Sequence, residues 1–263
     1  MKKVTSKDGT KIAYDKIGQG PVVILVLGAL NSRKSGAELA KLLAAHFTVI
    51  SYDRRGRGDS TDTPPYAPQR EIEDLAALIH EVGGQVYLYG HSSGAGIVFE
   101  AAIQLHNEVK KIAIYEAPYS LGIDASKAAR EYDKQLKRLI TSGRNSDAVA
   151  MLFRNAGMSD KQIQDMKRMP SWRGFEALAP TLAYDSALLG VGHRLPTTHL
   201  AGINTPTLVM HGGASSQSMH DAAQAISAVV PEAQLLTLAG QTHHVSPEVI
   251  APVLAEFFSA SKR

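Results

Sequence analysis

The sequence of 263 residues predicts an α/β protein: a mostly parallel, eight-stranded sheet with helices on both faces and an inserted helical cap. Strand-like and helical patterns alternate along most of the chain, which favours a parallel sheet covered by helices. Val22 to Leu27 is an unbroken aliphatic run, typical of a strand buried on both faces. The strand signal disappears from 119 to 203. We therefore expect a core of residues 1–118 and 204–263 and a cap of residues 119–203.

The amino-terminal half supplies most of the alternation. A hairpin is expected first, with strands at 4–6 and 10–16 around the turn Lys7-Asp8-Gly9. Later strands are expected at 22–27, 47–52, 86–90 and 109–115. Helices are expected between or after them at 37–45, 69–82 and 94–105, where apolar residues recur at helical spacing.

The segment after residue 118 is expected to be helical, and the alternation then resumes. Helices are expected at 125–142, 146–156 and 160–169, with Pro170, Pro180 and Pro196 as breaks. Two more strands are expected at 207–211 and 234–238, and two more helices at 219–230 and 247–260. Pro247 suits the first turn of the last helix.

Composition excludes several classes of function. A hydrophobic content of 44% and a charged content of 20% are ordinary for a globular protein. The net charge of +3 is mild, so we expect no nucleic-acid partner. The densest basic cluster, Arg54-Arg55-x-Arg57, is expected in a solvated loop. The chain has no Cys, which excludes disulfides and thiolate chemistry, and its His residues show no metal-binding spacing.

The amino terminus and the apolar stretches bear on location. Met1-Lys2-Lys3 has no apolar segment behind it, so we expect no signal peptide. The longest apolar stretch, Val22 to Leu30, is too short to span a bilayer. We expect a cytoplasmic protein without a membrane partner, as a monomer or homodimer.

The stretch Gly90-His91-Ser92-Ser93-Gly94 carries the main chemical signal. It follows a predicted strand, precedes a predicted helix and fits the nucleophile-elbow pattern Gly-x-Ser-x-Gly. A strand that turns at once into a helix strains the residue at the apex and exposes its side chain above the sheet. Small residues two positions before and after the apex allow that turn. The pattern predicts Ser92 as a nucleophile.

A nucleophilic Ser needs a base within hydrogen-bond reach, and the base needs an acidic partner. With a nucleophile elbow, the His comes late in the chain, after the last strand. His243 and His244 both lie there, and we favour His243 because Gly240-Gln241-Thr242 supplies a short flexible approach. Ser92, Glu116 and His243 all follow predicted strands, so they are expected at the carboxyl edge of the sheet, where sites form.

Taken together, several motifs resemble those of the α/β-hydrolase fold family, in particular its small, capped, cofactor-free esterase and haloperoxidase-like members. These motifs are Asp8-Gly9-Thr10, the Gly28 loop, Tyr52-Asp53-Arg54-Arg55-Gly56-Arg57-Gly58-Asp59-Ser60, the elbow, Pro206-Thr207-Leu208-Val209-Met210-His211-Gly212, and the His243 loop followed by Pro247. The resemblance covers nearly the whole chain except the cap, whose sequence does not identify a substrate. It implies a protein without a cofactor.

Two positions depart from the family pattern. Most relatives have His-Gly after the third strand, where this chain has Leu27-Gly28. The oxyanion donor is a backbone N–H, so the resemblance still implies Ala29 and Ser93 as the oxyanion hole.

The second departure concerns the acid. The usual triad Asp is replaced here by Ser215, and the next carboxylate is Asp221. Some family members draw the acid from the end of the strand beside the elbow strand, and Glu116 fits that alternative. A buried Glu there is costly without a partner. Glu116 is the preferred acid, with Asp221 or no acid as the alternatives.

These residues predict a serine hydrolase that acts on a small carboxylic ester, thioester or lactone through an acyl-serine intermediate. One alternative keeps the triad but changes the reaction to that of a lyase, an acyltransferase or a perhydrolase. Another is a hydrolase-like protein that binds a ligand without turning it over, which the missing Asp leaves open. In each of these three hypotheses, the partner of the protein is a small molecule.

Overall fold

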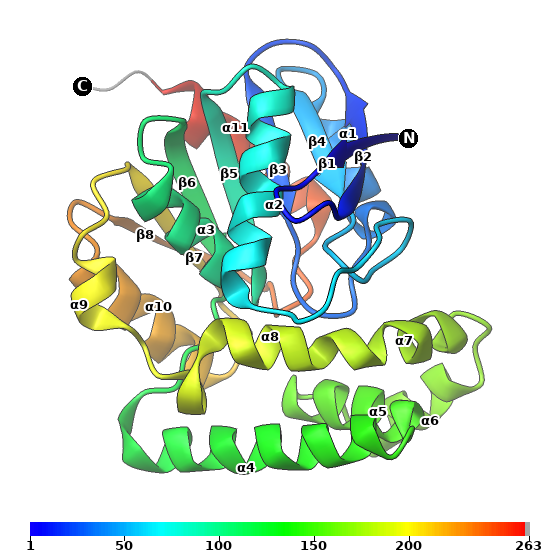
Figure 1. Ribbon diagram of the computed structural model, residues 1–263. Coiled ribbons are helices and arrows are strands. Elements are labelled where there is room, and N and C mark those ends of the chain that lie inside the picture. The colour runs from blue at the N-terminus through cyan, green and yellow to red at the C-terminus, as the bar shows by residue number, and fades with distance from the viewer. Residues whose placement is uncertain (261–263) are drawn as a thin grey trace.

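A computed structural model describes residues 1–260 of the protein. Within them, eight strands form one sheet in the order β1-β2-β4-β3-β5-β6-β7-β8 (Figure 1). The pairs β1–β2 and β2–β4 are antiparallel, and the other pairs are parallel. The strands are β1 (Lys2–Thr5), β2 (Lys11–Ile17), β3 (Val22–Val26), β4 (Thr48–Tyr52), β5 (Val86–His91), β6 (Val109–Tyr115), β7 (Thr207–Gly212) and β8 (Gln234–Leu238). The predicted fold class is confirmed.

Helices cover both faces of the sheet. One apolar cluster joins the sheet to α2, α3 and α10, and a second joins it to α1 and α11. In Figure 1, α2 and α3 lie in front of the sheet and α11 lies behind it. The bounds are α1 (Ala37–Leu43), α2 (Pro68–Glu81), α3 (Gly94–Gln104), α10 (Gln217–Val229) and α11 (Pro247–Ser259).

Strand β3 shows why the sheet needs a helical layer on each side. Ile24 and Val26 belong to the first cluster, while Val23 and Leu25 belong to the second, and all four are buried. Successive side chains of a strand point to opposite faces, so an unbroken aliphatic run supplies both clusters.

The segment 119–203 is mostly helical: residues 122–189 lie along the carboxyl edge of the sheet, at the bottom of Figure 1, and residues 197–200 lie at the left beside α10. It has an apolar cluster of its own, which includes Leu136, Phe153 and Trp172 and also takes in Leu30 from the loop after β3. Its helices are α4 (Gly122–Thr141), α5 (Asn145–Asn155), α6 (Asp160–Lys167), α7 (Trp172–Leu178), α8 (Leu182–Leu189) and α9 (Thr197–Leu200).

Helices α7, α8 and α9 are absent from the sequence prediction. The bounds of α7, α8 and α9 show that none exceeds eight residues. Pro180 lies between α7 and α8 in the short 3₁₀ helix Ala179–Thr181, so one continuous helical pattern does not develop. Elsewhere the predicted and observed ends differ by a few residues, as expected for helix and strand boundaries.

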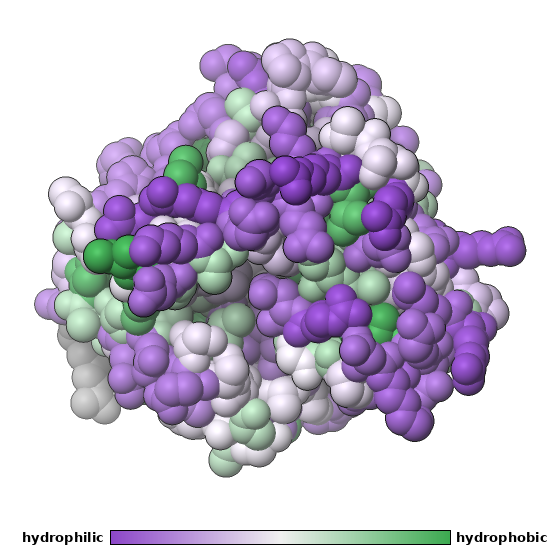
Figure 2. Space-filling view, turned by 90° about the horizontal axis from the view of Figure 1, so that it is seen from below, coloured by the Kyte–Doolittle hydropathy of each residue, from purple (hydrophilic) through white to green (hydrophobic). Residues whose placement is uncertain are grey.

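The face formed by the helical segment is mostly hydrophilic, with small separate hydrophobic groups (Figure 2). Exposed apolar side chains in the segment include Leu121, Ile123 and Val191. Within residues 1–260, no helix combines the length and the apolar content that a membrane span requires.

Candidate active site

Ser92 stands at the junction between β5 and α3, and its φ of 55° places it in the left-handed region. That conformation is strained for a residue with a side chain. The neighbouring glycines permit close packing: a Cβ at Gly94 would lie 2.2 Å from the carbonyl oxygen of Val26 in β3. A Cβ at Gly90 would lie 2.9 Å from Cα of Ala95. The elbow therefore has the geometry that the Gly-x-Ser-x-Gly frame predicts.

The loop after β3 lies directly against Ser92. A Cβ on Gly28 would come within 2.8 Å of Ser92 Cβ and 3.2 Å of its Oγ. Among residues 1–260, neither the Ala29 N–H nor the Ser93 N–H donates a hydrogen bond. The Ser93 N–H also lies at the N-terminus of α3, where the helix dipole favours negative charge. Both amides, one on the residue after Ser92 and one on the residue after Gly28, are thus free to bind an oxyanion.

Glu116 and His243 meet beside this elbow. Glu116 follows β6 with a φ of 50°, and its Oε2 lies 2.8 Å from Nδ1 of His243 in the loop before α11. Its Oε1 accepts hydrogen bonds from the Gly212 N–H, at 2.9 Å, and from the Ser215 hydroxyl. Burial alone would raise the pKa of Glu116, but these hydrogen bonds outweigh burial and lower it. Glu116 is an ionised acceptor for His243.

The His243 loop is tied to the two strands that end at Ser92 and Glu116. Tyr115 donates a hydrogen bond of 2.6 Å to the carbonyl of Thr242. His91 Nε2 lies 3.0 Å from the carbonyl oxygen of His243 and donates to it, because a carbonyl only accepts. Burial lowers the pKa of His91 to about 3, so this imidazole is neutral at pH 7.

The alternative residues do not join this group. The His244 side chain is exposed, and Asp221 is an exposed residue of α10 whose Oδ1 accepts from Gln217 at 2.8 Å. Ser215 occupies the position of the usual triad Asp and instead donates to Glu116. Within residues 1–260, no hydrogen bond joins Ser92 and His243; such contacts often tighten only when substrate binds.

The expectation that Arg54, Arg55 and Arg57 lie in a solvated loop is wrong. All three side chains are buried, with exposures of 2%, 0% and 1%. Burying a guanidinium is costly unless it is paired. The partners are carboxylates in distant parts of the chain: Glu71 and Asp185 for Arg54, Asp8 and Asp74 for Arg55, and Asp185 for Arg57. Asp185 belongs to α8, so this loop also binds the helical segment.

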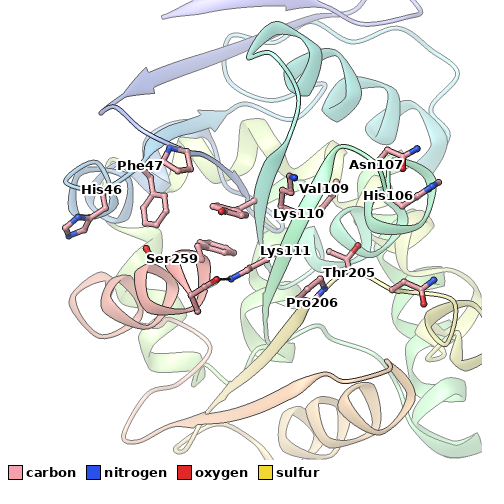
Figure 3. A pocket seen from close by; sticks show the side chains of 15 residues that line it. His46, Phe47, His106, Asn107, Val109, Lys110, Lys111, Thr205, Pro206 and Ser259 are labelled. Carbon is pink, nitrogen blue, oxygen red and sulfur yellow. Dashed lines mark hydrogen bonds between the residues drawn. The ribbon is translucent and has the colours of Figure 1, made fainter. Parts of the chain in front are cut away.

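Other features lie away from Ser92. A surface cavity is lined by residues at the amino ends of strands, including Phe47, Val109 and Pro206, on the edge of the sheet opposite the elbow (Figure 3). Lys111 there donates to the carbonyls of Phe257 and Ala260, which ties it to the end of α11. In the part of the chain that the structure describes, no three His, Asp or Glu side chains are grouped to hold a metal ion.

The chain is similar to known hydrolases along most of its length. The crystal structure of an α/β hydrolase from Sphaerobacter thermophilus is 46% identical, with a TM-score of 0.89 over 98% of this chain and 100% of that one. A bifunctional esterase/perhydrolase of Acinetobacter calcoaceticus is 25% identical over 222 residues, which is 80% of each protein. An uncharacterized hydrolase of Bacillus subtilis is 29% identical over 137 residues, 49% of this chain and 50% of that relative.

The model of the alpha/beta hydrolase family matches residues 23–253, which include the elbow, Glu116 and His243. Together with the sheet order and the strained serine after β5, this match confirms the resemblance found in the sequence. The chain belongs to the α/β hydrolase family.

Proposed function

We propose that the protein is a serine hydrolase of small carboxylic esters, thioesters or lactones. The observation that carries this proposal is the hydrogen bond of 2.8 Å from His243 to the buried carboxylate of Glu116, next to a serine in the nucleophile-elbow conformation. A buried carboxylate on Nδ1 keeps the proton on that nitrogen and leaves Nε2 free to act as a base.

In this mechanism His243 takes the proton of the Ser92 hydroxyl while Oγ attacks the acyl carbon. The negative charge that develops on the acyl oxygen is stabilised by the N–H groups of Ala29 and Ser93. The imidazolium is stabilised by Glu116 and gives its proton to the leaving alcohol, thiol or ring oxygen. Water, deprotonated by His243, then releases the acid from acyl-Ser92. The helical segment 119–203 acts as a cap that sets the acyl group accepted.

The test is a series of p-nitrophenyl esters of increasing acyl length, assayed with the wild type and with Ser92→Ala. We expect hydrolysis by the wild type, an acyl adduct on Ser92 that mass spectrometry detects after rapid acid quenching, and neither in the variant. Ser218→Ala, which removes the hydroxyl of an exposed serine in α10, is the control and should keep the wild-type rate. Hydrolysis by Ser92→Ala at the wild-type rate would overturn the proposal.

A second candidate is a perhydrolase, in which hydrogen peroxide instead of water attacks acyl-Ser92 and forms a peracid. It is favoured by the similarity to the esterase/perhydrolase of Acinetobacter calcoaceticus. Assays with ester and peroxide together measure the ratio of peracid to acid. A protein that forms no adduct but gains thermal stability on adding an ester would instead be a ligand-binding protein.

A further inference from the structure

The Gly28–Ala29 peptide is held by a buried arginine. Arg57 Nη1 donates a hydrogen bond of 2.7 Å to the carbonyl oxygen of Gly28. This carbonyl and the Ala29 N–H belong to one planar trans peptide unit, so they point in opposite directions. Fixing the carbonyl therefore fixes the direction of the Ala29 N–H. A charged donor on the carbonyl also polarises the peptide and strengthens the N–H as a donor.

The second oxyanion residue is connected to the same arginine. The Ser93 hydroxyl donates to Asp185 Oδ1 at 2.7 Å, and Arg57 Nη2 donates to Asp185 Oδ2 at 2.8 Å. Arg54 Nη1 adds a contact of 2.7 Å to Oδ1. One carboxylate thus joins the arginine behind Ala29 to the side chain of Ser93. Asp185 comes from α8, so this connection runs through the helical segment.

The loop has one side-chain hydrogen bond of its own, from Asn31 Nδ2 to the Ala29 carbonyl at 3.0 Å, which does not involve the Gly28–Ala29 peptide. Leu30, next to Ala29, has a φ of 56°, a strained conformation that persists only where neighbouring contacts impose it. Its side chain is buried in the apolar cluster of the helical segment, again away from the sheet. Contacts to Arg57 and to the helical segment therefore help to hold the loop after β3.

We propose that Arg57 and Asp185 are positioning residues that set the two oxyanion donors, Ala29 N–H and Ser93 N–H, for the tetrahedral intermediate. The proposal rests on the proposed hydrolase function. It adds that α8, through Asp185, forms part of the support of the oxyanion site. In this proposal both side chains act through the backbone amides that hold the oxyanion of the substrate.

A buried ion pair elsewhere in the same loop provides a matched control. Arg55 is as buried as Arg57 and donates to Asp74 at 2.8 and 2.7 Å and to Asp8 at 2.8 Å. None of these contacts reaches the loop after β3 or the elbow. Arg55→Met and Arg57→Met remove the same group from the same buried loop, so both should lower stability, but only the second should affect the oxyanion site.

The experiment measures kcat and KM for p-nitrophenyl acetate together with inhibition by a trifluoromethyl ketone, which forms a tetrahedral oxyanion with an active serine. For Arg57→Met and Asp185→Asn we expect kcat and the affinity for the ketone to fall together, by about 10- to 100-fold. KM is expected to stay within about twofold. Arg57→Lys keeps the charge but reaches fewer acceptors, so its kcat and its affinity for the ketone should lie between those of the wild type and of Arg57→Met. Arg55→Met should match the wild type in kcat below its melting temperature.

The outcomes separate the two proposals. A wild type that neither hydrolyses esters nor binds the ketone overturns the hydrolase function and this inference with it. An active wild type whose Arg57→Met, Arg57→Lys and Asp185→Asn variants lose only thermal stability, as Arg55→Met does, overturns the positioning role alone. A kcat loss without a matching loss of ketone affinity would also contradict it, because the oxyanion would then be held as before.

Discussion

The two sides of Ser92 are built from different parts of the molecule. On the acid–base side, Glu116 and His243 are held by Gly212, Ser215 and the Thr242 carbonyl contact, all outside the segment 119–203. On the side of the proposed oxyanion donors, the Gly28–Ala29 peptide connects through Arg57 to Asp185 of α8, and the Ser93 hydroxyl bonds Asp185 directly. One side belongs to the sheet and its loops, while the other depends on the helical segment.

In the proposed mechanism, this difference separates proton transfer from charge stabilisation. Rearrangement of the helical segment should leave the Glu116–His243 pair intact, because no residue of that segment is among the hydrogen-bond partners of Glu116 and His243 within residues 1–260. The same rearrangement would change the surroundings of Asp185. Variants on the two sides should therefore have different signatures.

The largest effect is expected for Glu116→Gln. Oε1 of Glu116 accepts two hydrogen bonds, so the amide oxygen of Gln should take that place and its NH₂ group should face His243. His243 Nδ1 would then have to accept, which puts the proton on Nε2 and removes the base. We expect kcat for p-nitrophenyl acetate to fall about 10³- to 10⁴-fold. Asp221→Asn is the control; a similar loss there would move the acid to α10.

Gly28→Ala should have the next largest effect, on the oxyanion side. The added Cβ would lie 2.8 Å from Ser92 Cβ, so the loop or the serine must move. We expect kcat to fall about 10²-fold, the size expected when an oxyanion donor is lost. Gly213→Ala, where the nearest atoms lie at 3.4 Å, is the control. Wild-type activity in Gly28→Ala would show that this loop does not bind the oxyanion.

A carboxylate at position 215 in place of Glu116 tests whether the acid can act on His243 from either position. Ser215 donates to Oε1 of Glu116, so an Asp at 215 places a carboxylate close to the volume that Glu116 leaves empty in Glu116→Ala. We expect Glu116→Ala with Ser215→Asp to recover about tenfold in kcat over Glu116→Ala, since a carboxylate near His243 restores the preferred tautomer. Ser215→Asn in the Glu116→Ala background has the size of Asp without its charge, so it should recover no kcat over Glu116→Ala alone.

The smallest effect concerns stability and pH. The pKa of His91 is lowered from 6.5 to about 3 by burial, so between these values the unfolded chain binds a proton that the native state does not. This linkage lowers the free energy of unfolding as the pH falls through that range. His91→Gln cannot titrate and should lose less stability between pH 7 and 5 in urea unfolding. The exposed His46→Gln should follow the wild type; equal slopes for His91→Gln would contradict the assignment.

The sequence predicts one side of the site better than the other. Val22 to Leu27, the elbow glycines and the strand before Glu116 are local patterns, and local patterns reveal strands and their ends. Glu116 and His243, 127 residues apart, could be paired because parallel strands bring their carboxyl ends to one edge. The resemblance to the family supplied the acid and the oxyanion donors.

The contacts that hold the proposed oxyanion donors could not be predicted from the sequence. Arg54 and Arg57 pair with Asp185, from which they are separated by 131 and 128 residues in the chain. Asp185 lies in α8, a short helix that the sequence pattern does not predict. Without a visible partner, an arginine cluster is expected in solvent, because burial of an unpaired charge is costly. Pairing that depends on how a helical segment lies on the sheet appears only in the structure.

In the proposed mechanism, Glu116 acts through His243 to make Ser92 nucleophilic. The most direct measurement is the rate at which a fluorophosphonate modifies the protein at pH 7, followed by intact mass and peptide mapping, for the wild type, Asp221→Asn and Glu116→Gln. We expect one phosphonyl group on Ser92, equal rates for the wild type and Asp221→Asn, and a rate at least about 100-fold lower for Glu116→Gln. Labelling of Glu116→Gln at the wild-type rate, or of a residue other than Ser92, would contradict the account.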